Sequence, residues 1–507
     1  MDKVLLIVPP VSIPKDRANF NVNFPIGLGY IAAVLEQASY EVIILDTVVE
    51  KLEQETLIPG KHNLMRVGLT FEEITRFIRD ARPNYVGITS MFSKQHENAV
   101  LTAQAVKNAD SEIPVIVGGA HATADPNHVI EEDAIDVVVV GEGENIFLPL
   151  LEGYKSGNGL HSVEGLAFID SSGKKILTPR PHYPDVEGIP FPARHLFPME
   201  KYFAARQRHG MFDMDKSVRS INIETSRGCP FDCNFCSVYQ MFGKDLRCRS
   251  ADSVLAEIDE LVTKYNVNDI YLVDDQFLAP RKRALSLLDG IISRNYGITF
   301  DAPNGLSPWI LTEEILVKMK AVGFWRVNLA VESGNEWVLK NIINKPVNLK
   351  KLPEVVRLAR ENALEISAFI VVGNISENAV ETFAQMKDSF DLMRKLNIGS
   401  FAVSYLSPHA GSEAYDVVQK MGYLTEEYDD NYYSNPSIAS PLWTTRELEA
   451  FVEVQRVLCF VEDTPLAWPV KLFTLNLGGL LLNQRYRVMY FLINFYGNVK
   501  SSFSSIR

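Results

Sequence analysis

The sequence predicts an α/β protein in which two parallel-sheet domains are followed by a mainly helical C-terminal region. Three observations predict this fold: two series of short Val- and Ile-rich runs, amphipathic stretches between the runs, and the loss of this alternation after about residue 415. Such runs, separated by helical patterns, are typical of buried parallel strands joined by crossover helices. At 507 residues, the chain is long enough for about three domains.

The composition is that of a globular protein, with 47% hydrophobic and 22% charged residues, and excludes disordered and collagen-like chains. The formal net charge of -13 argues against a nucleic-acid partner, because phosphate contacts need a basic surface. The apolar run from Val4 to Val8 is too short for a secretory signal, and no run of 18 apolar residues predicts a membrane span. We therefore expect a cytoplasmic protein.

The first series occupies residues 1–155 and predicts a doubly wound sheet of the flavodoxin or Rossmann type. The expected strands are 4–8, 42–45, 85–88, 115–117 and 137–140, and the expected helices include 27–37, 71–80 and 97–107. In such sheets ligands bind at the carboxyl ends of the strands. Candidate binding residues therefore follow the runs: Pro9, Thr89, Ser90, Gly118, Gly119, His121, Gly141, Glu142, Gly143 and Glu144.

Residues 156–205 have the character of a connector. A hairpin pattern at 165–169 and 175–178 is followed by six prolines between residues 179 and 198.

The second series occupies residues 206–415 and contains six expected strands. They are 221–224, 270–273, 298–301, 327–331, 366–372 and 401–405. Six β/α units predict a partial TIM barrel, whose chemistry gathers at the carboxyl ends of its strands. Residues 416–507 complete the chain as the helical region.

Three of the five cysteines, Cys229, Cys233 and Cys236, lie within eight residues after the first strand of the second series. The spacing C-x3-C-x2-C provides three thiolates, which leave one iron of a 4Fe–4S cube open to a substrate or cofactor. A zinc site with Cys248 as its fourth ligand is the alternative, and a disulfide is disfavoured in a cytosolic chain. Structural zinc sites usually have two paired cysteine motifs, whereas Cys248 stands alone, so we favour iron and sulfur.

This motif, placed after the first strand of a six-fold β/α series, resembles the radical S-adenosylmethionine superfamily. The resemblance covers about residues 220–410. It implies that the open iron binds S-adenosylmethionine and that electron transfer from the cube releases a 5′-deoxyadenosyl radical. It also implies S-adenosylmethionine contacts for Phe235, Asp274, Asp275, Glu332 and Ser333, although any one of these residues alone would suit a helix cap or a turn. No catalytic acid or base follows from it.

The glycine-containing strand ends of the first domain resemble those of the cobalamin-binding domain found ahead of many radical S-adenosylmethionine enzymes. A dinucleotide site would instead need G-x-G-x-x-G after the first strand, where this chain has Val8-Pro9-Pro10. The resemblance implies that the candidate residues at these strand ends contact cobalamin. The motif Asp-x-His-x-x-Gly is absent, so we expect no protein ligand on the cobalt and a hydrogen-bonding loop role for His121.

The domain order resembles that of cobalamin-dependent radical S-adenosylmethionine methylases, and residues 92–95 and 344–349 resemble the class found in the fosfomycin pathway. This implies transfer of a methyl group from S-adenosylmethionine, through methylcobalamin, to an unactivated carbon or a phosphinate phosphorus. The substrate would be a small-molecule or lipid biosynthetic intermediate, and a flavodoxin- or ferredoxin-type donor would supply electrons. The alternatives are a radical cyclase, oxidation or carbon–carbon coupling enzyme without net methyl transfer, and a cobalamin-binding sensor or electron carrier without turnover.

After Asp463 the chain has basic and many apolar residues but no acidic residue. Residues 464–507 therefore suit peripheral contact with an anionic membrane surface or a lipid substrate. A helix packed on the barrel explains the same composition.

Overall fold

The computed structural model describes residues 2–15, 22–156, 159–209, 216–425 and 436–463. By its internal contacts the chain divides into residues 1–449, which contain both sheet domains, and residues 450–507. No helix within the described ranges combines the length and the apolar character needed to cross a membrane. The tail expected to contact membranes or the barrel, residues 464–507, lies outside the described residues.

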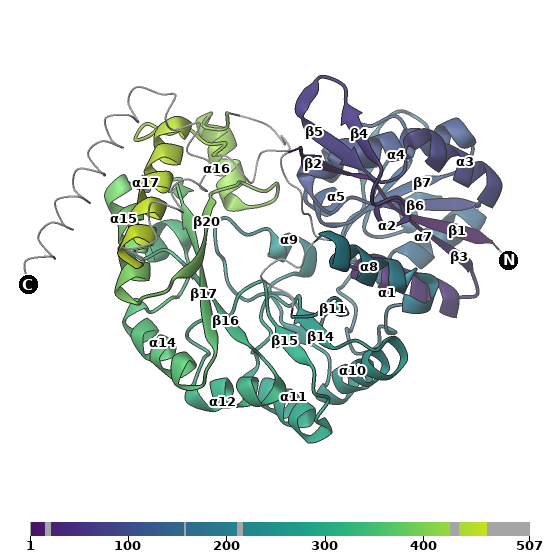
Figure 1. Cartoon of the computed structure of the whole chain (residues 1–507). Helices are drawn as coiled ribbons and strands as arrows, with labels where there is room; N and C mark the ends of the chain where they lie inside the picture. The colour runs from purple at the N-terminus through teal and green to yellow at the C-terminus, as the bar shows by residue number, and fades with distance from the viewer. Residues whose placement is uncertain (1, 16–21, 157–158, 210–215, 426–435, 464–507) are drawn as a thin grey trace, which may run out of the picture. The chain divides into compact units, whose positions relative to one another are not determined.

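A seven-stranded sheet forms the centre of the N-terminal domain, in the order β10-β9-β8-β7-β6-β1-β3 (Figure 1). Five of its strands are parallel, and they confirm the five that the apolar runs predict: β1 (Lys3–Val8), β3 (Glu41–Asp46), β6 (Tyr85–Thr89), β7 (Val115–Gly118) and β8 (Val137–Val139). The chain passes from β1 to β3 on one side and later to β6 on the other. The point where the strand order reverses thus lies between β1 and β6, and ligands of such sheets bind there.

The middle residues of the strands are apolar because both faces of the sheet are covered. On one face α3 (Phe71–Ala81) and α4 (His96–Ala109) share a buried core with Leu5 and Ile7. On β1 the side chains that alternate with these two, Val4 and Leu6, are also fully buried. Helices α1 (Ile26–Gln37) and α7 (Phe147–Ser156) contact each other.

The sheet differs from the prediction at one edge. The hairpin expected in the connector, formed by β9 (Leu166–Ile169) and β10 (Lys175–Leu177), extends the N-terminal sheet, because β9 pairs antiparallel with β8. Leu166 and Ala167 are buried there. An edge of β8 left open would expose an unpaired row of backbone groups, and the hairpin covers it.

A second difference is a small antiparallel sheet that the sequence pattern did not predict. It contains β2 (Val11–Pro14), β4 (Glu55–Ile58) and β5 (Lys61–Val67). The first residues of β5 are polar and exposed. The buried half of β5 includes the charged Arg66, so the strand lacks the continuous apolar run on which the prediction depended.

The second domain is the expected six-unit partial barrel. Its strands form two parallel three-stranded sheets, β11 (Ser220–Ile223), β14 (Asp269–Leu272) and β15 (Thr299–Asp301), and β16 (Arg326–Glu332), β17 (Glu365–Val372) and β20 (Ser400–Tyr405). Isolated parallel bridges, Phe300 with Phe324 and Leu306 with Leu329, lie between the two sheets. In addition, the Nε atom of Arg326 donates to Asp301 Oδ2 over 3.1 Å, with both side chains buried.

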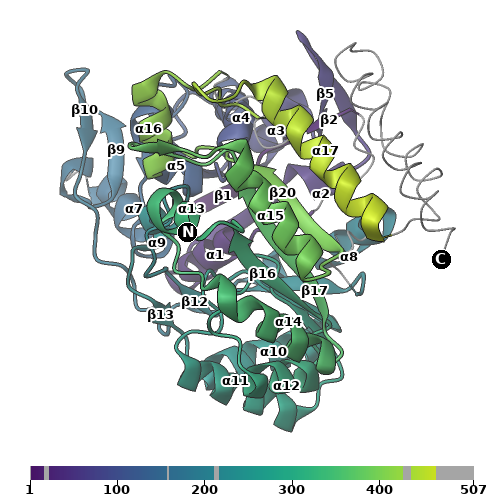
Figure 2. The ribbon, with the colours of Figure 1, turned by 90° about the vertical axis from the view of Figure 1, so that its left-hand side faces the viewer.

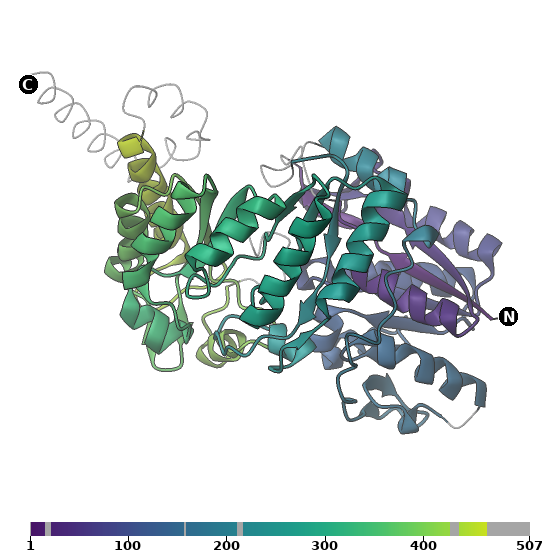
Figure 3. The ribbon, with the colours of Figure 1, turned by 90° about the horizontal axis from the view of Figure 1, so that it is seen from below.

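The crossover helices lie outside the barrel strands (Figures 1 and 2). They are α10 (Ala251–Tyr265), α11 (Arg281–Arg294), α12 (Glu313–Val322), α14 (Leu352–Glu361) and α15 (Phe383–Lys395). From below, the teal and green helices α10 to α12 lie side by side (Figure 3). This arrangement leaves the carboxyl ends of the strands, and the loops that follow them, as the place for a site. Beyond the barrel the structure describes α16 (Glu413–Met421) and α17 (Thr445–Asp463).

Candidate functional site

Three cysteines lie on the loop between β12 (Ser226–Arg227) and α9 (Val238–Phe242), which we call the cysteine loop. The strand β12 pairs with β13 (Arg247–Cys248), so the loop leaves a short antiparallel ladder. Gly228 takes a φ of +92°, and a Cβ there would overlap the carbonyl oxygen of Asp245. Glycine is therefore needed at this turn, because any other side chain would meet both strain and a steric clash.

The thiols of Cys229, Cys233 and Cys236 are partly exposed and form no disulfide. They lie close enough to influence one another, since the neighbouring thiolates help to raise the pKa values of Cys233 and Cys236. Burial is the main cause, and it raises the pKa of Cys233 to about 11 and that of Cys236 to about 12. Thiols raised in this way stay protonated at neutral pH unless a metal displaces the proton.

Three thiolates suit three corners of a 4Fe–4S cube, because the cube places each thiolate on a different iron. Among the residues that the structure describes, no group of three His, Cys, Asp or Glu side chains is arranged to hold a single metal ion. Cys248, the fourth ligand of the zinc alternative, donates from its Sγ to the Ala279 carbonyl over 3.7 Å and has Arg283 and Asp274 as its charged neighbours.

Of the residues expected at S-adenosylmethionine, three are neighbours of the cysteines. Phe235 packs with Cys233 against one apolar cluster. Asp275 interacts electrostatically with Cys229 and Cys236, and Glu332 with Cys233. Burial, with help from neighbouring carboxylates, raises the pKa of Asp275 to about 7.

The other two have partners within the protein. Asp274 accepts hydrogen bonds from the backbone N–H of Thr225 (3.1 Å), from the Thr225 hydroxyl (2.6 Å) and from the Ser226 hydroxyl (2.5 Å). The Ser333 hydroxyl accepts from the backbone N–H of Asn335 over 3.2 Å. These contacts hold the segment before the cysteine loop and the turn after β16. A cofactor role for Asp274 and Ser333 remains a prediction.

Sequence reasoning missed Lys345, although it lies in the 344–349 segment that carried part of the resemblance. Its ammonium forms a buried ion pair with Glu332 over 2.6 Å and interacts electrostatically with Cys233 and Cys236. Burial alone would lower the pKa of Lys345, but Glu332 and the two thiolates raise it. Lys345 therefore remains charged beside the cysteines.

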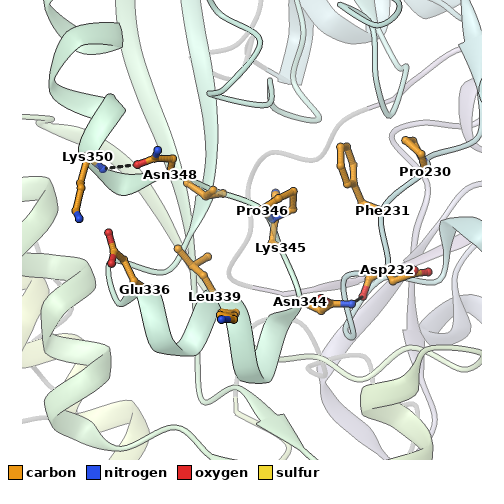
Figure 4. Close-up of a pocket in the computed structure, with 12 residues that line it drawn as sticks. Pro230, Phe231, Asp232, Glu336, Leu339, Asn344, Lys345, Pro346, Asn348 and Lys350 are labelled. Atoms are coloured by element: carbon orange, nitrogen blue, oxygen red, sulfur yellow. Dashed lines mark hydrogen bonds between the residues drawn. The ribbon is translucent and has the colours of Figure 1, made fainter.

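A cavity of about 800 Å³ lies against the cysteine loop (Figure 4). Pro230, Phe231 and Asp232 form one wall, and residues between 336 and 350 form the other, where Glu336 lies near Lys350. Three lysines line the cavity: Lys340, Lys345 and Lys350. Lys340 and Lys350 are exposed and have no ion pair with any residue in the described ranges. The lining also includes the carboxylates of Asp232 and Glu336, so the cavity carries charges of both signs.

The expected cobalamin residues gather at the carboxyl edge of the N-terminal sheet. Thr89 and Ser90 follow β6, and Gly118 and Gly119 follow β7. The Ser90 N–H donates to the Gly118 carbonyl over 2.6 Å, and Gly119 (φ +116°) lets the backbone pass close to the Ser90 carbonyl. The hydroxyl of Ser90, 2% exposed, has no hydrogen-bond partner among the described residues. A buried hydroxyl left in this way fits an edge that receives a ligand.

Pro9 follows β1, where the strand order reverses. His121 Nδ1 lies 3.1 Å from the Ser93 hydroxyl, and its ring packs against that of His96 at 4.9 Å between centroids. Burial, together with His96 and His128, lowers the pKa of His121 to about 3, so the ring is neutral at pH 7. His121 therefore lies in the short helix after Gly119 and not in the expected loop, and it hydrogen-bonds within its own domain.

The turn formed by residues 141–144 forms contacts with Arg227 that the sequence did not predict. Gly141 (φ +120°) is anchored by a hydrogen bond from its N–H to the Thr123 hydroxyl over 3.0 Å. The carboxylates of Glu142 and Glu144, expected at cobalamin, accept hydrogen bonds from Arg227, two residues before Cys229. Sequence reasoning missed Arg227, because nothing in its local pattern indicates partners about 85 residues away.

Comparison with known proteins identifies the families of the two sheet domains. The B12 binding domain family matches residues 20–151, and the radical SAM superfamily matches residues 223–387. The cytidylyl-2-hydroxyethylphosphonate methyltransferase of Streptomyces wedmorensis is 30% identical over 472 residues, with 88% of each chain covered. The anaerobic magnesium-protoporphyrin IX monomethyl ester cyclase of Rubrivivax gelatinosus is 26% identical over 416 residues, covering 81% of this chain and 68% of the relative.

Among solved structures, the chain is similar in fold to the radical S-adenosylmethionine methyltransferase TsrM of Kitasatospora setae, which holds cobalamin and a 4Fe–4S cluster. The TM-score is 0.64 at 18% identity, with 83% of this chain and 79% of that chain covered. The shared architecture therefore includes both the N-terminal sheet domain and the barrel.

Proposed function

Because this chain belongs to the cobalamin-dependent radical S-adenosylmethionine methyltransferases, we propose that it methylates an unactivated carbon of an anionic small molecule. Its cofactors are a 4Fe–4S cluster, S-adenosylmethionine and cobalamin. The observation that carries the proposal is the contact between the 141–144 turn and Arg227, which joins the cobalamin edge to the cysteine loop within one compact unit. A reaction that uses both cofactors on one substrate needs the two sites side by side.

We assign the cluster to Cys229, Cys233 and Cys236, and S-adenosylmethionine to Phe235, Asp275, Glu332 and Lys345. Asp274 and Ser333, also predicted at S-adenosylmethionine, hold the surrounding loops as well. When bound, the cluster and S-adenosylmethionine supply a carbon-centred radical and cobalamin supplies the methyl group. The ammonium of Lys345 would face the carboxylate of S-adenosylmethionine, and Asp275 its amino group. No side chain is assigned as a proton donor or acceptor, since a radical step does not require one.

Cobalamin is assigned to the edge formed by Pro9, Thr89, Ser90, the Gly118–Gly119 backbone and the 141–144 turn. The Ser90 hydroxyl is the group best placed to donate to or accept from the ligand, because it is buried and no described protein group bonds to it. The glycines allow close approach of a large flat ligand. At the 141–144 turn we assign the backbone to this role, because both carboxylates already pair with arginine.

The lysines of the cavity support an anionic substrate. Lys340 and Lys350 present two ammonium groups, without an ion pair to any described residue, in the cavity that Phe231 of the cysteine loop also lines. The relative from Streptomyces wedmorensis is named for a substrate with a phosphonate and a cytidylyl group. We therefore propose that the substrate of this protein carries phosphate or phosphonate, which ammonium groups bind as point charges.

The test is incubation of anaerobic, cluster-reconstituted protein with hydroxocobalamin, a strong reductant and S-adenosylmethionine bearing a deuterated methyl group. Cytidylyl-2-hydroxyethylphosphonate is the first substrate to try, with hydroxyethylphosphonate as a matched compound without the nucleotide. Transfer of the labelled methyl, with S-adenosylhomocysteine and 5′-deoxyadenosine formed together, supports methylation. Substrate-dependent 5′-deoxyadenosine with an unmethylated, altered product would instead support ring closure or oxidation.

The remaining partners are an electron donor and a membrane surface. We propose that a flavodoxin- or ferredoxin-type protein reduces the cluster and that both proteins meet in the cytoplasm, where thiols stay reduced. For residues 464–507, whose structure is not described, we propose peripheral contact with anionic lipid because of their basic and apolar composition. Sedimentation with anionic vesicles, with and without these residues, tests this contact, and equal sedimentation would dismiss it.

A further inference from the structure

Arg227 is held by carboxylates from two domains. Its Nη1 donates to Glu142 over 2.5 Å, its Nη2 to Glu144 over 2.6 Å, and its Nε to Glu224 over 2.7 Å. Arg227 is 5% exposed, and the three carboxylate side chains are between 2% and 13% exposed. Each of the three guanidinium nitrogens thus serves a different acceptor, which is a geometry that the single ammonium of lysine cannot reproduce.

Because its charges are buried, the contact between Arg227 and the three carboxylates is costly to break. Burial alone would lower the pKa of Arg227, but the three carboxylates outweigh it and raise the pKa. Arg247 also pairs with Glu142 and donates to the Pro184 carbonyl over 2.8 Å. If the guanidinium moved away, Glu144 would remain buried without a described ion-pair partner, which is costly. The 141–144 turn and Arg227 must therefore move together.

A second contact follows the cysteines. The helix α9, which begins two residues after Cys236, packs against α5 (Ala120–Ala124), the helix that follows Gly119 (Figures 1 and 2). Arg180, in the connector, donates to the carbonyl of Thr123 in α5 over 3.2 Å and also to the carbonyl of Gln240 in α9. Residues 229–236 are thus held at both ends by elements of the cobalamin edge.

From this geometry we propose that Arg227 is a positioning residue that couples cobalamin binding to the cysteine loop. The inference rests on the proposed function only in taking these two places as the cofactor sites. A ligand that orders the 141–144 turn would fix the guanidinium, and the guanidinium would fix the backbone two residues before Cys229. Coupling of this kind is reciprocal, so the cluster with S-adenosylmethionine increases the affinity for cobalamin by the same factor.

The test measures binding of hydroxocobalamin to the full chain by equilibrium dialysis, with and without the reconstituted cluster and S-adenosylmethionine. We expect the wild-type dissociation constant to fall at least fivefold when the cluster is present. In Arg227→Lys we expect the two constants to agree within twofold while iron content is retained. A wild-type ratio of one, or an unchanged ratio in Arg227→Lys, would overturn the proposal.

Glu144→Gln covers the case in which Arg227→Lys fails to fold or to hold iron. It keeps the guanidinium and its bonds to Glu142 and Glu224, and it should lower the coupling ratio by a factor of two to three. Arg326→Lys is the matched control, because it alters a buried arginine–carboxylate pair within the barrel. In Arg326→Lys the ratio of the two dissociation constants should stay at the wild-type value even if the melting temperature falls. An unchanged ratio in Glu144→Gln would count against the proposal.

A spectroscopic readout separates positioning from general stability. The electron paramagnetic resonance signal of the reduced cluster with S-adenosylmethionine should change when cobalamin is added to the wild type and to Arg326→Lys. It should not change in Arg227→Lys. These measurements need no substrate, so a protein that couples the two sites but methylates nothing would contradict the proposed function and leave this inference standing.

Discussion

The Nζ atom of Lys345 lies 2.6 Å from Oε1 of Glu332, and both side chains are about nine-tenths buried beside the cysteine loop. Glu332 takes a positive φ of +65° at the end of β16, a conformation rarely adopted by side-chain-bearing residues. Strain of this kind persists where the surroundings fix it, and it gathers at ligand sites. The pair thus brings a carboxylate and an ammonium to the place where we assign S-adenosylmethionine.

Lys345→Met should weaken S-adenosylmethionine binding by at least tenfold. It should also destabilise the protein by about 3–5 kcal/mol, because the Glu332 carboxylate would stay buried without its partner. Equilibrium binding of S-adenosylmethionine and thermal melting measure the two effects. Lys350→Met, on the same cavity, is the control: its side chain is exposed, so melting and S-adenosylmethionine affinity should hold while the affinity for an anionic substrate falls. Equal S-adenosylmethionine affinity in both variants would contradict the assignment.

Replacing Cys229, Cys233 or Cys236 with alanine should abolish the cluster. Iron in anaerobically reconstituted protein is expected to fall from about four atoms per chain to near zero, because two thiolates cannot hold the cube. Cys248→Ala should retain the wild-type iron content, since that thiol donates to the Ala279 carbonyl instead. Loss of metal in Cys248→Ala, or zinc in place of iron, would revive a zinc site.

Gly228→Ala should prevent correct closure of the cysteine loop. Its positive φ costs about 1–3 kcal/mol for a residue with a side chain, and the overlap with Asp245 adds to that cost. We expect low iron content and a lower melting temperature. Gly297→Ala has a similar φ of +69° but open space around the added methyl, so it should lose a little stability and no iron. Equal iron content in Gly228→Ala and Gly297→Ala would contradict the need for glycine at residue 228.

The buried carboxyl of Asp46 should make the stability of the protein depend on pH. Burial raises the pKa of Asp46 to about 6, although the Tyr202 hydroxyl, 2.7 Å away, opposes the rise. The folded state therefore binds the proton more tightly than the unfolded chain, whose value is about 3.9. The contribution of Asp46 to the free energy of unfolding is therefore fully present below about pH 4 and is lost as the pH rises through about 6.

Asp46→Asn is neutral at every pH and should escape that loss. Its stability should exceed that of the wild type by up to about 3 kcal/mol at pH 8, and by about half as much at pH 5. Melting temperatures at the two values measure the difference. Asp133→Asn, at an exposed position, should change melting at neither pH. A gain for Asp46→Asn that does not depend on pH would rule out titration of this carboxyl as the cause.

The sequence alone was sufficient for the features that depend on local pattern. Five apolar runs predict the parallel strands of the first sheet, and six predict those of the barrel, because strands with a buried face carry a run of apolar residues. The C-x3-C-x2-C spacing predicts three thiols on one loop, since residues so close in sequence cannot lie far apart. The sequence did not predict the strand β5 or the pairing of β9 with β8. Pairing at the edge of a sheet depends on which strand the folded sheet leaves open.

The site itself required the tertiary structure wherever partners come from distant segments. Glu142 and Glu144 occupy a turn that sequence reasoning assigned to cobalamin, yet their carboxylates bind Arg227 in the other domain. Lys345 becomes a partner of Glu332 only when the segment after β16 folds back over the cysteine loop. Hydrophobic periodicity reports which face of an element is buried, whereas the partner of a buried charge depends on how the elements dock. The sequence therefore determined the cofactor chemistry, and the fold decided which side chains connect the two proposed cofactor sites.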